Sequence, residues 1–230
     1  MRVDAVPIAP ATDRRGNCRG CGAGRERERG ATLIEFALVL ILGALPIVLG
    51  ILQVAALLVA RNTVNLATFM AARQGAVSGA DQGAMRRELA RGLVPLYVRA
   101  ARDGLVPVAD VVEAYGAALV DVVALDSLIV HNPTRAALDR FGESRGGRRV
   151  IPNDAIEFRP LALQNANVLT ISVVHCQPLV VPVVGPALAS ALAYLNSDPR
   201  QQRCIASGRA PILARASLVM QSDVQGDALP

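Results

Sequence analysis

Few side chains in this sequence could take part in catalysis or hold a metal ion. The chain has two histidines, His131 and His175, and its basic side chains are all arginine, so a P-loop, a Schiff base or a Ser-Lys site cannot be built. The motifs HExxH, GxGxxG and DxSxS are also missing from the sequence. His175 falls on the apolar side of an expected strand, as a core histidine does, and Asp121, Asp126 and Asp154 are expected in solvent or in turns. We therefore predict no catalytic residue, no metal ligand and no cofactor.

One carboxylate stands where a long apolar segment begins. The stretch RERERGATLIEF, residues 25–36, contains Glu35 at the edge of an uncharged run, residues 36–60, in which Gln53 is the only strongly polar residue. A helix over this run would be roughly 37 Å long, more than the ~30 Å of a bilayer core. Because the run is apolar on all faces and about twice the usual helix length, it predicts a membrane-spanning helix rather than a buried core helix.

The arginines are distributed unevenly on the two sides of this run. Six arginines stand in residues 14–29, whereas Arg61 and Arg73 are the only two in the twenty residues that follow the run. By the positive-inside rule, the N-terminus is cytoplasmic and residues 61–230 are exported. A cleavable secretory signal peptide is the alternative, but its apolar region would be only ~7 to 15 residues long.

The net charge of +5 does not indicate a nucleic-acid partner. Residues 1–30 hold seven arginines against four acids, which leaves 17 arginines against 15 acids in the rest of the chain. The body of the protein is therefore nearly neutral. No basic face interleaved with aromatic residues is visible, so no nucleic acid is predicted as a partner.

The four cysteines divide between the two sides of the predicted membrane. Cys18 and Cys21 form a CxxC pair, which is half of a zinc site, but two further ligands are needed and the other cysteines are across the membrane. Unpaired thiols are the favoured interpretation. Cys176 and Cys204 lie in the exported part, where an oxidising compartment favours a disulfide. Such a bridge would contribute roughly 3 to 4 kcal/mol by constraining the unfolded chain.

Two explanations fit the position of Glu35. Thr32 and Glu35 have the spacing of a capping box, in which both side chains satisfy backbone donors at a helix start whose dipole also favours an anion. Alternatively, cleavage after Gly30 would create a free amine at Ala31, and Glu35 of a neighbouring subunit could neutralise it when helices pack side by side in lipid. That role would offset the cost of a carboxylate in a membrane helix, about 2.5 to 3.5 kcal/mol at the centre and less near an end.

These residues resemble those of a known family. Gly30, the apolar helix from Ala31, and Glu35 followed by Phe36 resemble the processing site of type IV pilin-like proteins. The stretch RGATLIEFALVL is especially similar to the TadE-like pseudopilins of the tight-adherence (Tad/Flp) pilus system. The later stretches HNPTRAALDRFG, IPNDAIEFRP, NANVLTISVVHCQPLVVPVVG and LARASLVMQSD also resemble the exported domain of these proteins. The chain departs from many relatives in having Ile41 near the place of their helix proline.

The resemblance implies a function in pilus assembly. It implies that a prepilin peptidase cuts between Gly30 and Ala31, and that Glu35 and Phe36 serve the later assembly step. The chain would be an inner-membrane minor pseudopilin, a structural or initiation component of Tad/Flp pilus biogenesis and adhesion, not an enzyme. Its expected partners are the prepilin peptidase, other pilin-like subunits, the Tad inner-membrane assembly platform and membrane lipid. The alternative is an uncleaved, signal-anchored periplasmic binding or scaffolding protein, and an exported enzyme would need a polar pocket that the sequence does not indicate.

The expected fold class is α+β, with a long N-terminal transmembrane helix and a small exported domain of pilin-like type. The predicted domains are a cleaved cytoplasmic leader, a transmembrane and juxtamembrane helix, and a periplasmic domain, residues 1–30, 31–75 and 76–230. Residues 169–173 and 214–221 alternate between apolar and polar types, which predicts two strands of an antiparallel sheet beside the long helix.

Helices and loops of the exported part follow from local signals. One helix is expected over residues 84–93, ended by Pro95, and another over residues 108–118. Residues 119–130 could supply a strand, or their first half could extend the preceding helix. A short helix is expected from an N-cap, a first-turn proline and a terminal glycine, namely Asn132, Pro133 and Gly142. The glycine- and arginine-rich residues 142–152 are expected to form an exposed loop.

One more uncharged segment, residues 178–195, is long enough to be a second membrane span. Prolines and a glycine interrupt it, and a second span would place Cys204 in the reducing cytoplasm. A strand to about Val184 followed by a short helix is therefore the expected structure.

Overall fold

The computed structural model describes four stretches of the chain, residues 33–98, 106–154, 161–181 and 184–229. They form helices and antiparallel sheets, which confirms the predicted α+β class. The chain divides into two compact units, Met1–Ile47 and Val48–Pro230, and the boundary between them falls inside the N-terminal helix.

A continuous helix, Leu33–Val77, opens the described part of the chain. It contains a π-helical turn, η1 (Leu40–Ala44), followed by α2 (Leu45–Val77). Pro46 stands two residues after η1. Because proline has no N–H for the carbonyl of residue i−4, a widened turn beside it accommodates the missing hydrogen bond. After Val77 the chain turns through Gly79, which has a φ of 69°.

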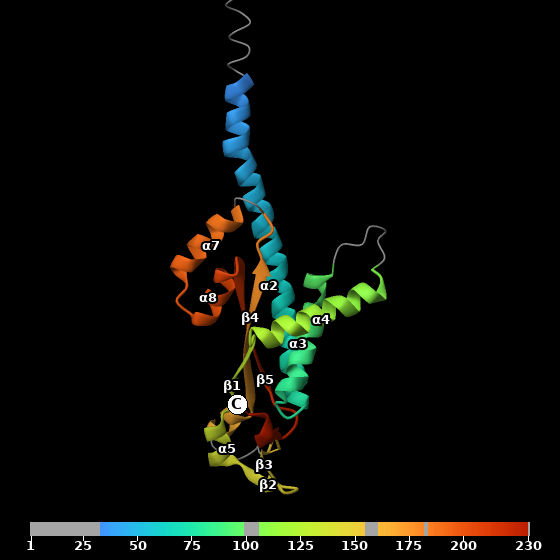
Figure 1. The fold of residues 1–230 in the computed structure, drawn as a ribbon. Coiled ribbons are helices and arrows are strands. Elements are labelled where there is room, and N and C mark those ends of the chain that lie inside the picture. The colour runs from blue at the N-terminus through green and yellow to red at the C-terminus, as the bar shows by residue number, and fades with distance from the viewer. Residues whose placement is uncertain (1–32, 99–105, 155–160, 182–183, 230) are drawn as a thin grey trace, which may run out of the picture. The chain divides into compact units, whose positions relative to one another are not determined.

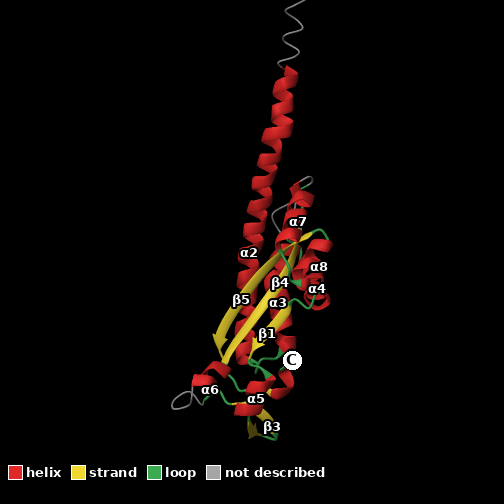
Figure 2. Cartoon of the chain, turned by 90° about the vertical axis from the view of Figure 1, so that its left-hand side faces the viewer, coloured by secondary structure: helices red, strands yellow, loops and turns green. Residues whose placement is uncertain are grey.

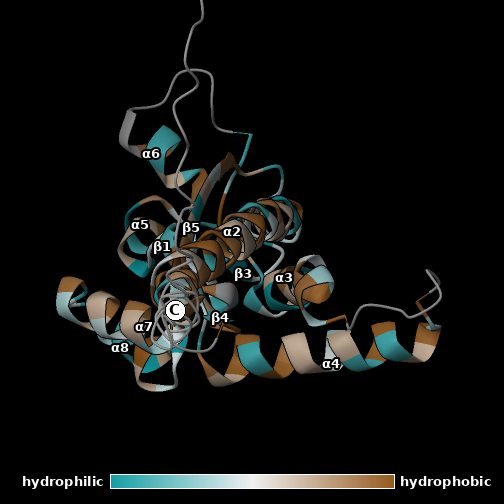
Figure 3. Cartoon of the chain, turned by 90° about the horizontal axis from the view of Figure 1, so that it is seen from above, coloured by the Kyte–Doolittle hydropathy of each residue, from teal (hydrophilic) through white to brown (hydrophobic). Residues whose placement is uncertain are grey.

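The next two helices, α3 (Gln82–Tyr97) and α4 (Val108–Ala124), follow α2 in the chain. α3 begins at Asp81, whose carboxylate accepts hydrogen bonds from two backbone N–H groups of the first turn. α3 packs against α2 and along α4 (Figure 1). Figure 3 shows hydrophobic and hydrophilic residues alternating around α4, as expected for a helix with one buried face.

The predicted end of the second helix at Pro95 is wrong, because α3 continues through this residue to Tyr97. Pro95 removes one backbone hydrogen bond. The side chains around it compensate, since Leu93 is buried and both Leu96 and Tyr97 pack against the core. Tertiary packing thus outweighs the local signal of the proline.

The main sheet contains β1 (Leu128–Asn132), β4 (Val168–Pro178) and β5 (Arg209–Val219). Its order is β1-β4-β5 (Figure 2), and both pairs are antiparallel. In the β4–β5 pair, Ile171 lies opposite Ala216. The two strands expected from apolar alternation are thereby confirmed, and each extends beyond the predicted residues.

A second, smaller sheet replaces the exposed loop that was expected over residues 142–152. β2 (Glu143–Arg145) and β3 (Arg148–Ile151) form a hairpin, so the loop prediction is wrong. Gly146 and Gly147 both have positive φ, which is what the two central residues of a tight hairpin turn of type I′ require. The glycines that suggested a loop therefore make a turn between two strands.

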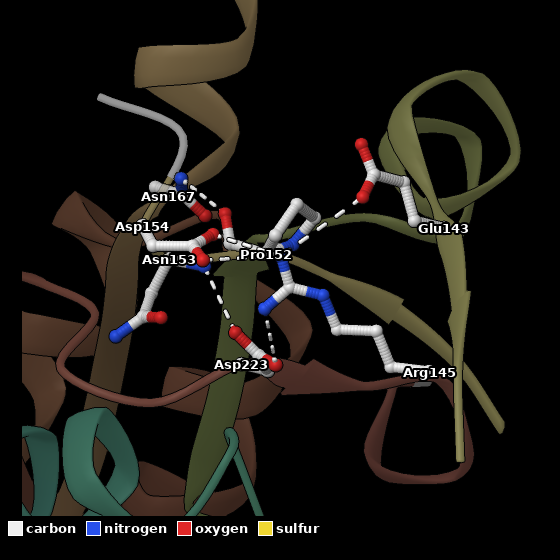
Figure 4. Close-up of polar contacts among 7 residues, drawn as sticks. All are labelled: Glu143, Arg145, Pro152, Asn153, Asp154, Asn167 and Asp223. Atoms are coloured by element: carbon white, nitrogen blue, oxygen red, sulfur yellow. Dashed lines mark hydrogen bonds and ion pairs between the residues drawn. The ribbon is translucent and has the colours of Figure 1, made fainter. Parts of the chain in front are cut away.

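Polar contacts join this hairpin to the neighbouring segments (Figure 4). An Arg145 Nη2 nitrogen lies 3.0 Å from Asp154 Oδ1, and its Nη1 lies 3.3 Å from Asp223 Oδ2. Asp223 also accepts a hydrogen bond from the backbone N–H of Asn153 at 3.0 Å. It directly precedes β6 (Val224–Gln225), which pairs with β3 as the third strand of the small sheet.

The short helix expected after residue 132 is present as α5 (Arg135–Phe141), with a different N-cap. Thr134, not Asn132, is the cap, because the Thr134 hydroxyl accepts a hydrogen bond from a backbone N–H of the first turn. Asn132 ends β1 instead, and its side-chain amide donates to the backbone carbonyls of Asn165 and Val168.

The remaining described elements are α6 (Leu161–Ala166), α7 (Val184–Leu195), α8 (Pro199–Ala206) and η2 (Gly226–Ala228). Residues 119–130 divide between the end of α4 and the start of β1, so both of the expected alternatives are partly correct. β4 ends at Pro178, earlier than the expected strand end near Val184. At 12 residues, α7 is too short to span a bilayer.

The core of the second unit lies between α2, α3 and the main sheet (Figures 1 and 2). An added Cβ at Gly75 of α2 would lie 2.7 Å from Leu169 of β4, so the glycine allows these two elements to approach closely. The largest fully buried apolar side chains are Met85, Leu89, Leu93, Ile151, Leu169 and Ile171.

Candidate functional site in the N-terminal helix

Of the predicted processing and assembly residues, Glu35 and Phe36 fall within the part of the chain that the structure describes. Gly30 and Ala31 are outside the described residues, as are Cys18 and Cys21. Glu35 and Phe36 lie in the first turns of the described helix, and both side chains are exposed.

The helix exposes large apolar side chains on all sides. In the most apolar window of Leu33–Val77, only 6% of the residues are buried. A core helix of a soluble protein would be mostly buried, so this exposure favours a membrane anchor. It is the only helix among the described residues that is long and apolar enough to cross a bilayer. The exposed side chains up to position 59 include Leu33, Ile34, Phe36, Val39, Leu42, Ile47, Ile51, Leu52, Val54 and Val59.

Burial begins on one face of the helix at Gln53. The side chain of Gln53 is only 1% exposed, and its Oε1 accepts a hydrogen bond of 3.1 Å from the backbone N–H of Val181. Further along α2, Ala60, Val64 and Ala67 are buried in the core. The one strongly polar residue of the uncharged run therefore attaches the segment after β4 to the helix.

A polar cluster on the domain involves residues that sequence reasoning did not bring together. Asp121 of α4 accepts a hydrogen bond of 2.6 Å from the Tyr97 hydroxyl, and Arg209 Nη1 lies 3.0 Å from the same carboxylate. Burial and the bond to Asp121 raise the pKa of Tyr97 well above its ordinary value. Asp121 was expected in solvent or in a turn; its side chain is partly exposed, and it links α3, α4 and β5. The three residues are far apart in the sequence, so no local signal could have revealed the cluster.

His175 lies beside this cluster. It is buried on β4, as predicted, and its ring meets the Tyr97 ring edge-on with 6.1 Å between centroids. Burial lowers the pKa of His175 below its usual value, although a hydrogen bond with Gln177 and the charge of Asp121 act in the opposite direction. A neutral, packed imidazole of this kind has a structural role.

The other aspartates that were expected in solvent or turns have arginine partners. Asp126, which has a φ of 44°, lies 3.1 Å from Arg86 and 3.5 Å from Arg200. Its position after α4 fits the turn expectation, but its charge is paired. Among the described residues, no group of three or more His, Cys, Asp or Glu side chains is placed to hold a metal ion.

Cys176 of β4 and Cys204 of α8 are joined by a disulfide, with their Cα atoms 5.2 Å apart. Both cysteines are buried, in a small apolar cluster with Val174 and Leu125. The bridge fastens α8 to the central strand of the main sheet.

The comparison with protein families identifies the N-terminal segment. The model of the family described as TadE-like protein matches residues 30–73, which include Gly30, Glu35, Phe36 and most of the helix. The resemblance predicted from this part of the sequence is thereby confirmed. The match ends at Arg73, so the resemblance of the later stretches stays a prediction. No match is found among curated proteins or among solved structures.

Proposed function

Since residues 30–73 match the TadE-like family, which supports involvement in the Tad pilus system, we propose that the chain is a minor pseudopilin of Tad/Flp pilus biogenesis. The observation that carries the proposal is the coincidence of this match with the exposed apolar helix Leu33–Val77. The helix serves both as membrane anchor and as assembly surface. In this function the chain is a structural or initiation component and not an enzyme.

Processing precedes assembly in this proposal. A prepilin peptidase removes residues 1–30 by cutting between Gly30 and Ala31. The mature chain then consists of a helix, residues 31–75, and a periplasmic domain, residues 76–230. The family match supports this step because it includes Gly30 and Ala31, the residues on the two sides of the proposed cut.

Assembly depends on the charge of Glu35. Cleavage leaves a positive amine on Ala31 close to the start of the helix, and the Glu35 carboxylate of a neighbouring subunit pairs with it when helices pack in lipid. The exposure of Glu35 and Phe36 supports this role, because both side chains are exposed in the described part of the chain and so are accessible to a neighbouring helix. Pairing would offset the cost of holding a carboxylate at the membrane edge.

The protein resides in the inner membrane with its N-terminus in the cytoplasm and its domain in the periplasm. The excess of arginine in residues 14–29 supports this orientation. Its partners are the prepilin peptidase, other pilin-like subunits, the Tad inner-membrane assembly platform and the surrounding lipid.

Two substitutions at Glu35 test the proposal against a capping role. Glu35→Val removes both the charge and the capping group, and it should leave cleavage intact while abolishing assembly of pili. Glu35→Gln keeps a residue that can complete a capping box but removes the charge, so it should fail in the same way. Piliation is measured by electron microscopy, and cleavage by the size of the chain on a gel.

The matched control is Thr32→Ala, which removes the other half of the capping box and should be tolerated. If Glu35→Gln assembles normally while Thr32→Ala does not, Glu35 is a helix cap. If the gel also shows that the leader is not removed, the chain is better explained as an uncleaved, signal-anchored binding or scaffolding protein.

A further inference from the structure

An uncharged surface segment follows β4 in the exported domain. Residues 178–197 contain no charged side chain, and most of α7 is exposed although it is apolar. Val180 is 78% exposed, Tyr194 92% and Leu195 74%. Large exposed apolar side chains grouped in one segment indicate a surface that contacts a membrane or another protein.

The segment is attached to the long helix at a defined position. The backbone N–H of Val181 donates its hydrogen bond to the buried Gln53 side chain. The uncharged run begins at residue 36, and a bilayer core of ~30 Å takes up about 20 helical residues, which corresponds to residues 36–55. Gln53 therefore stands at the exported edge of the membrane core, and Val180 and Val181 stand at the same level.

Apolar surface continues from this point along α7. A groove of about 500 Å³ lies between α2 and α7. Val54, Leu57, Leu58 and Arg61 line it on the α2 side, and Leu188 and Leu192 line it on the α7 side. Figures 1 and 2 show α7 beside α2 at the end of the domain opposite the β2–β3 hairpin. Apolar surface thus extends from Val54, at the end of the proposed span, across the groove to α7.

The polar groups of α7 are compatible with an interfacial position. The Ser190 hydroxyl donates to the carbonyl of Pro186 at 2.9 Å, so it does not need water as a partner. Tyr194 has an amphipathic ring of the kind enriched at membrane surfaces. Arg61, about 9 Å beyond residue 55 along the helix, stands at the level of the lipid headgroups.

We propose that the described parts of this segment, residues 178–181 and α7, lie in the boundary between headgroups and acyl chains of the exported leaflet, as a second, peripheral membrane contact of the domain. This inference rests on the proposed membrane anchoring of residues 36–55. The contact would hold the domain against the bilayer surface before assembly. Lipid is the favoured occupant over a neighbouring subunit because Gln53 holds the segment at the depth where the bilayer ends.

The chain contains no tryptophan, so a single introduced tryptophan gives an unambiguous fluorescence signal. The full chain carrying Val180→Trp is reconstituted into phosphatidylcholine vesicles, with and without bromine atoms on the acyl chains near the glycerol backbone. Bromine quenches tryptophan only on close contact. A side chain buried ~5 to 10 Å into the boundary should lose more than about half of its fluorescence.

Two control variants, one inside the membrane and one outside it, and a third variant on α7 complete the experiment. Ile47→Trp lies inside the proposed span and should be quenched by bromine placed deep in the acyl chains. Phe69→Trp lies on an exposed position of α2, about 24 Å beyond Gln53 along the helix, and should not be quenched. Tyr194→Trp at the far end of α7 should also lose fluorescence, to a smaller extent if α7 is inclined to the membrane.

The outcomes separate this inference from the proposed anchor. Quenching of both Ile47→Trp and Val180→Trp, with Phe69→Trp unaffected, supports the peripheral contact. Quenching of Ile47→Trp together with Val180→Trp no more quenched than Phe69→Trp overturns the inference and leaves the anchor standing. If Ile47→Trp is not quenched, the proposed membrane span is contradicted, and so is the peripheral contact that depends on it.

Discussion

Gln53 and His175 are polar residues that the sequence places among apolar neighbours, and each has a structural partner. Gln53 binds the backbone of Val181 and so joins α2 to the segment before α7. His175 packs on the ring of Tyr97 and so joins β4 to α3. Polar residues in apolar surroundings, which could be read as signs of function, connect elements here.

The buried imidazole of His175 predicts a loss of stability in mild acid. Burial lowers its folded-state pKa, whereas in the unfolded chain the pKa is about 6.5. Above about pH 6.5 the ring is neutral in both states and contributes no pH dependence. Below it, the unfolded chain binds a proton that the folded chain does not, so the free energy of unfolding should fall by up to about 1.4 kcal/mol per pH unit, until the pH passes the folded pKa.

Urea unfolding of the detergent-solubilised chain, followed by circular dichroism between pH 8 and 5, measures this effect. His175→Phe keeps an aromatic ring beside Tyr97 and should reduce the slope by about one proton. His131→Gln, which removes the other histidine at an exposed position, is the control for the general effect of replacing an imidazole. An equal slope in the wild type and in His175→Phe would show that His175 does not contribute.

At the scale of elements, the contact between α2 and α3 depends on Gly92. A Cβ added at this position would lie 2.7 Å from the Cβ and 2.8 Å from the Cα of Ala67. Because a backbone atom cannot move aside easily, Gly92→Ala should destabilise the domain by about 1 to 3 kcal/mol.

Gly116 of α4 is the matched control, because a Cβ there would meet no atom within 4 Å. Gly116→Ala should stabilise the domain by about 0.5 to 1 kcal/mol through helix propensity alone. Urea midpoints of the two variants should therefore shift in opposite directions. A Gly92→Ala variant as stable as the wild type would mean that α2 and α3 are not in close contact.

Elements whose signal is periodic could be predicted from the sequence. The uncharged run predicted the long helix. The apolar and polar alternation around Ile171 and Ala216 predicted the two long strands and their sheet. Strands with one buried and one exposed face are typical of antiparallel sheets, so the antiparallel pairing could also be predicted. Their register was not predictable, since it depends on residues 31 or more positions apart.

Predictions that rested on a single residue were less reliable. Pro95 did not end its helix because the residues around it are buried, and Asn132 did not cap α5 because its amide binds two carbonyls of a distant segment. The paired glycines at positions 146 and 147 could equally indicate a loop or a hairpin turn, and the flanking strands decide this through pairing with β6. Tertiary partners determined each of these outcomes.

At the scale of the whole molecule, the redox state of the Cys176–Cys204 disulfide in cells indicates on which side of the membrane the domain lies. A bridge closing a loop of this length, with a sequence separation of 28, should contribute about 3 to 4 kcal/mol to stability. In an oxidising compartment Cys176 and Cys204 should resist alkylation in intact cells until a reductant is added. The alkylated chain is detected by its shift on a gel.

A Cys176→Ala/Cys204→Ala chain is the control and should show no reductant-dependent shift. Its urea midpoint should be lower than that of the oxidised wild type. Direct alkylation of both cysteines in the wild type without reductant would place the domain in the cytoplasm and contradict the proposed orientation.

The proposed function requires a cleaved leader, a membrane-spanning helix and an exported domain. Cleavage of the leader is the step that can be tested most directly. The mature N-terminus can be read by mass spectrometry of the chain isolated from membranes of cells with and without the cognate prepilin peptidase. We predict a chain that starts at Ala31 in the presence of the peptidase and keeps its leader in its absence. A chain that starts at Met1, or within residues 2–30, regardless of the peptidase would contradict the pseudopilin function and favour an uncleaved membrane anchor.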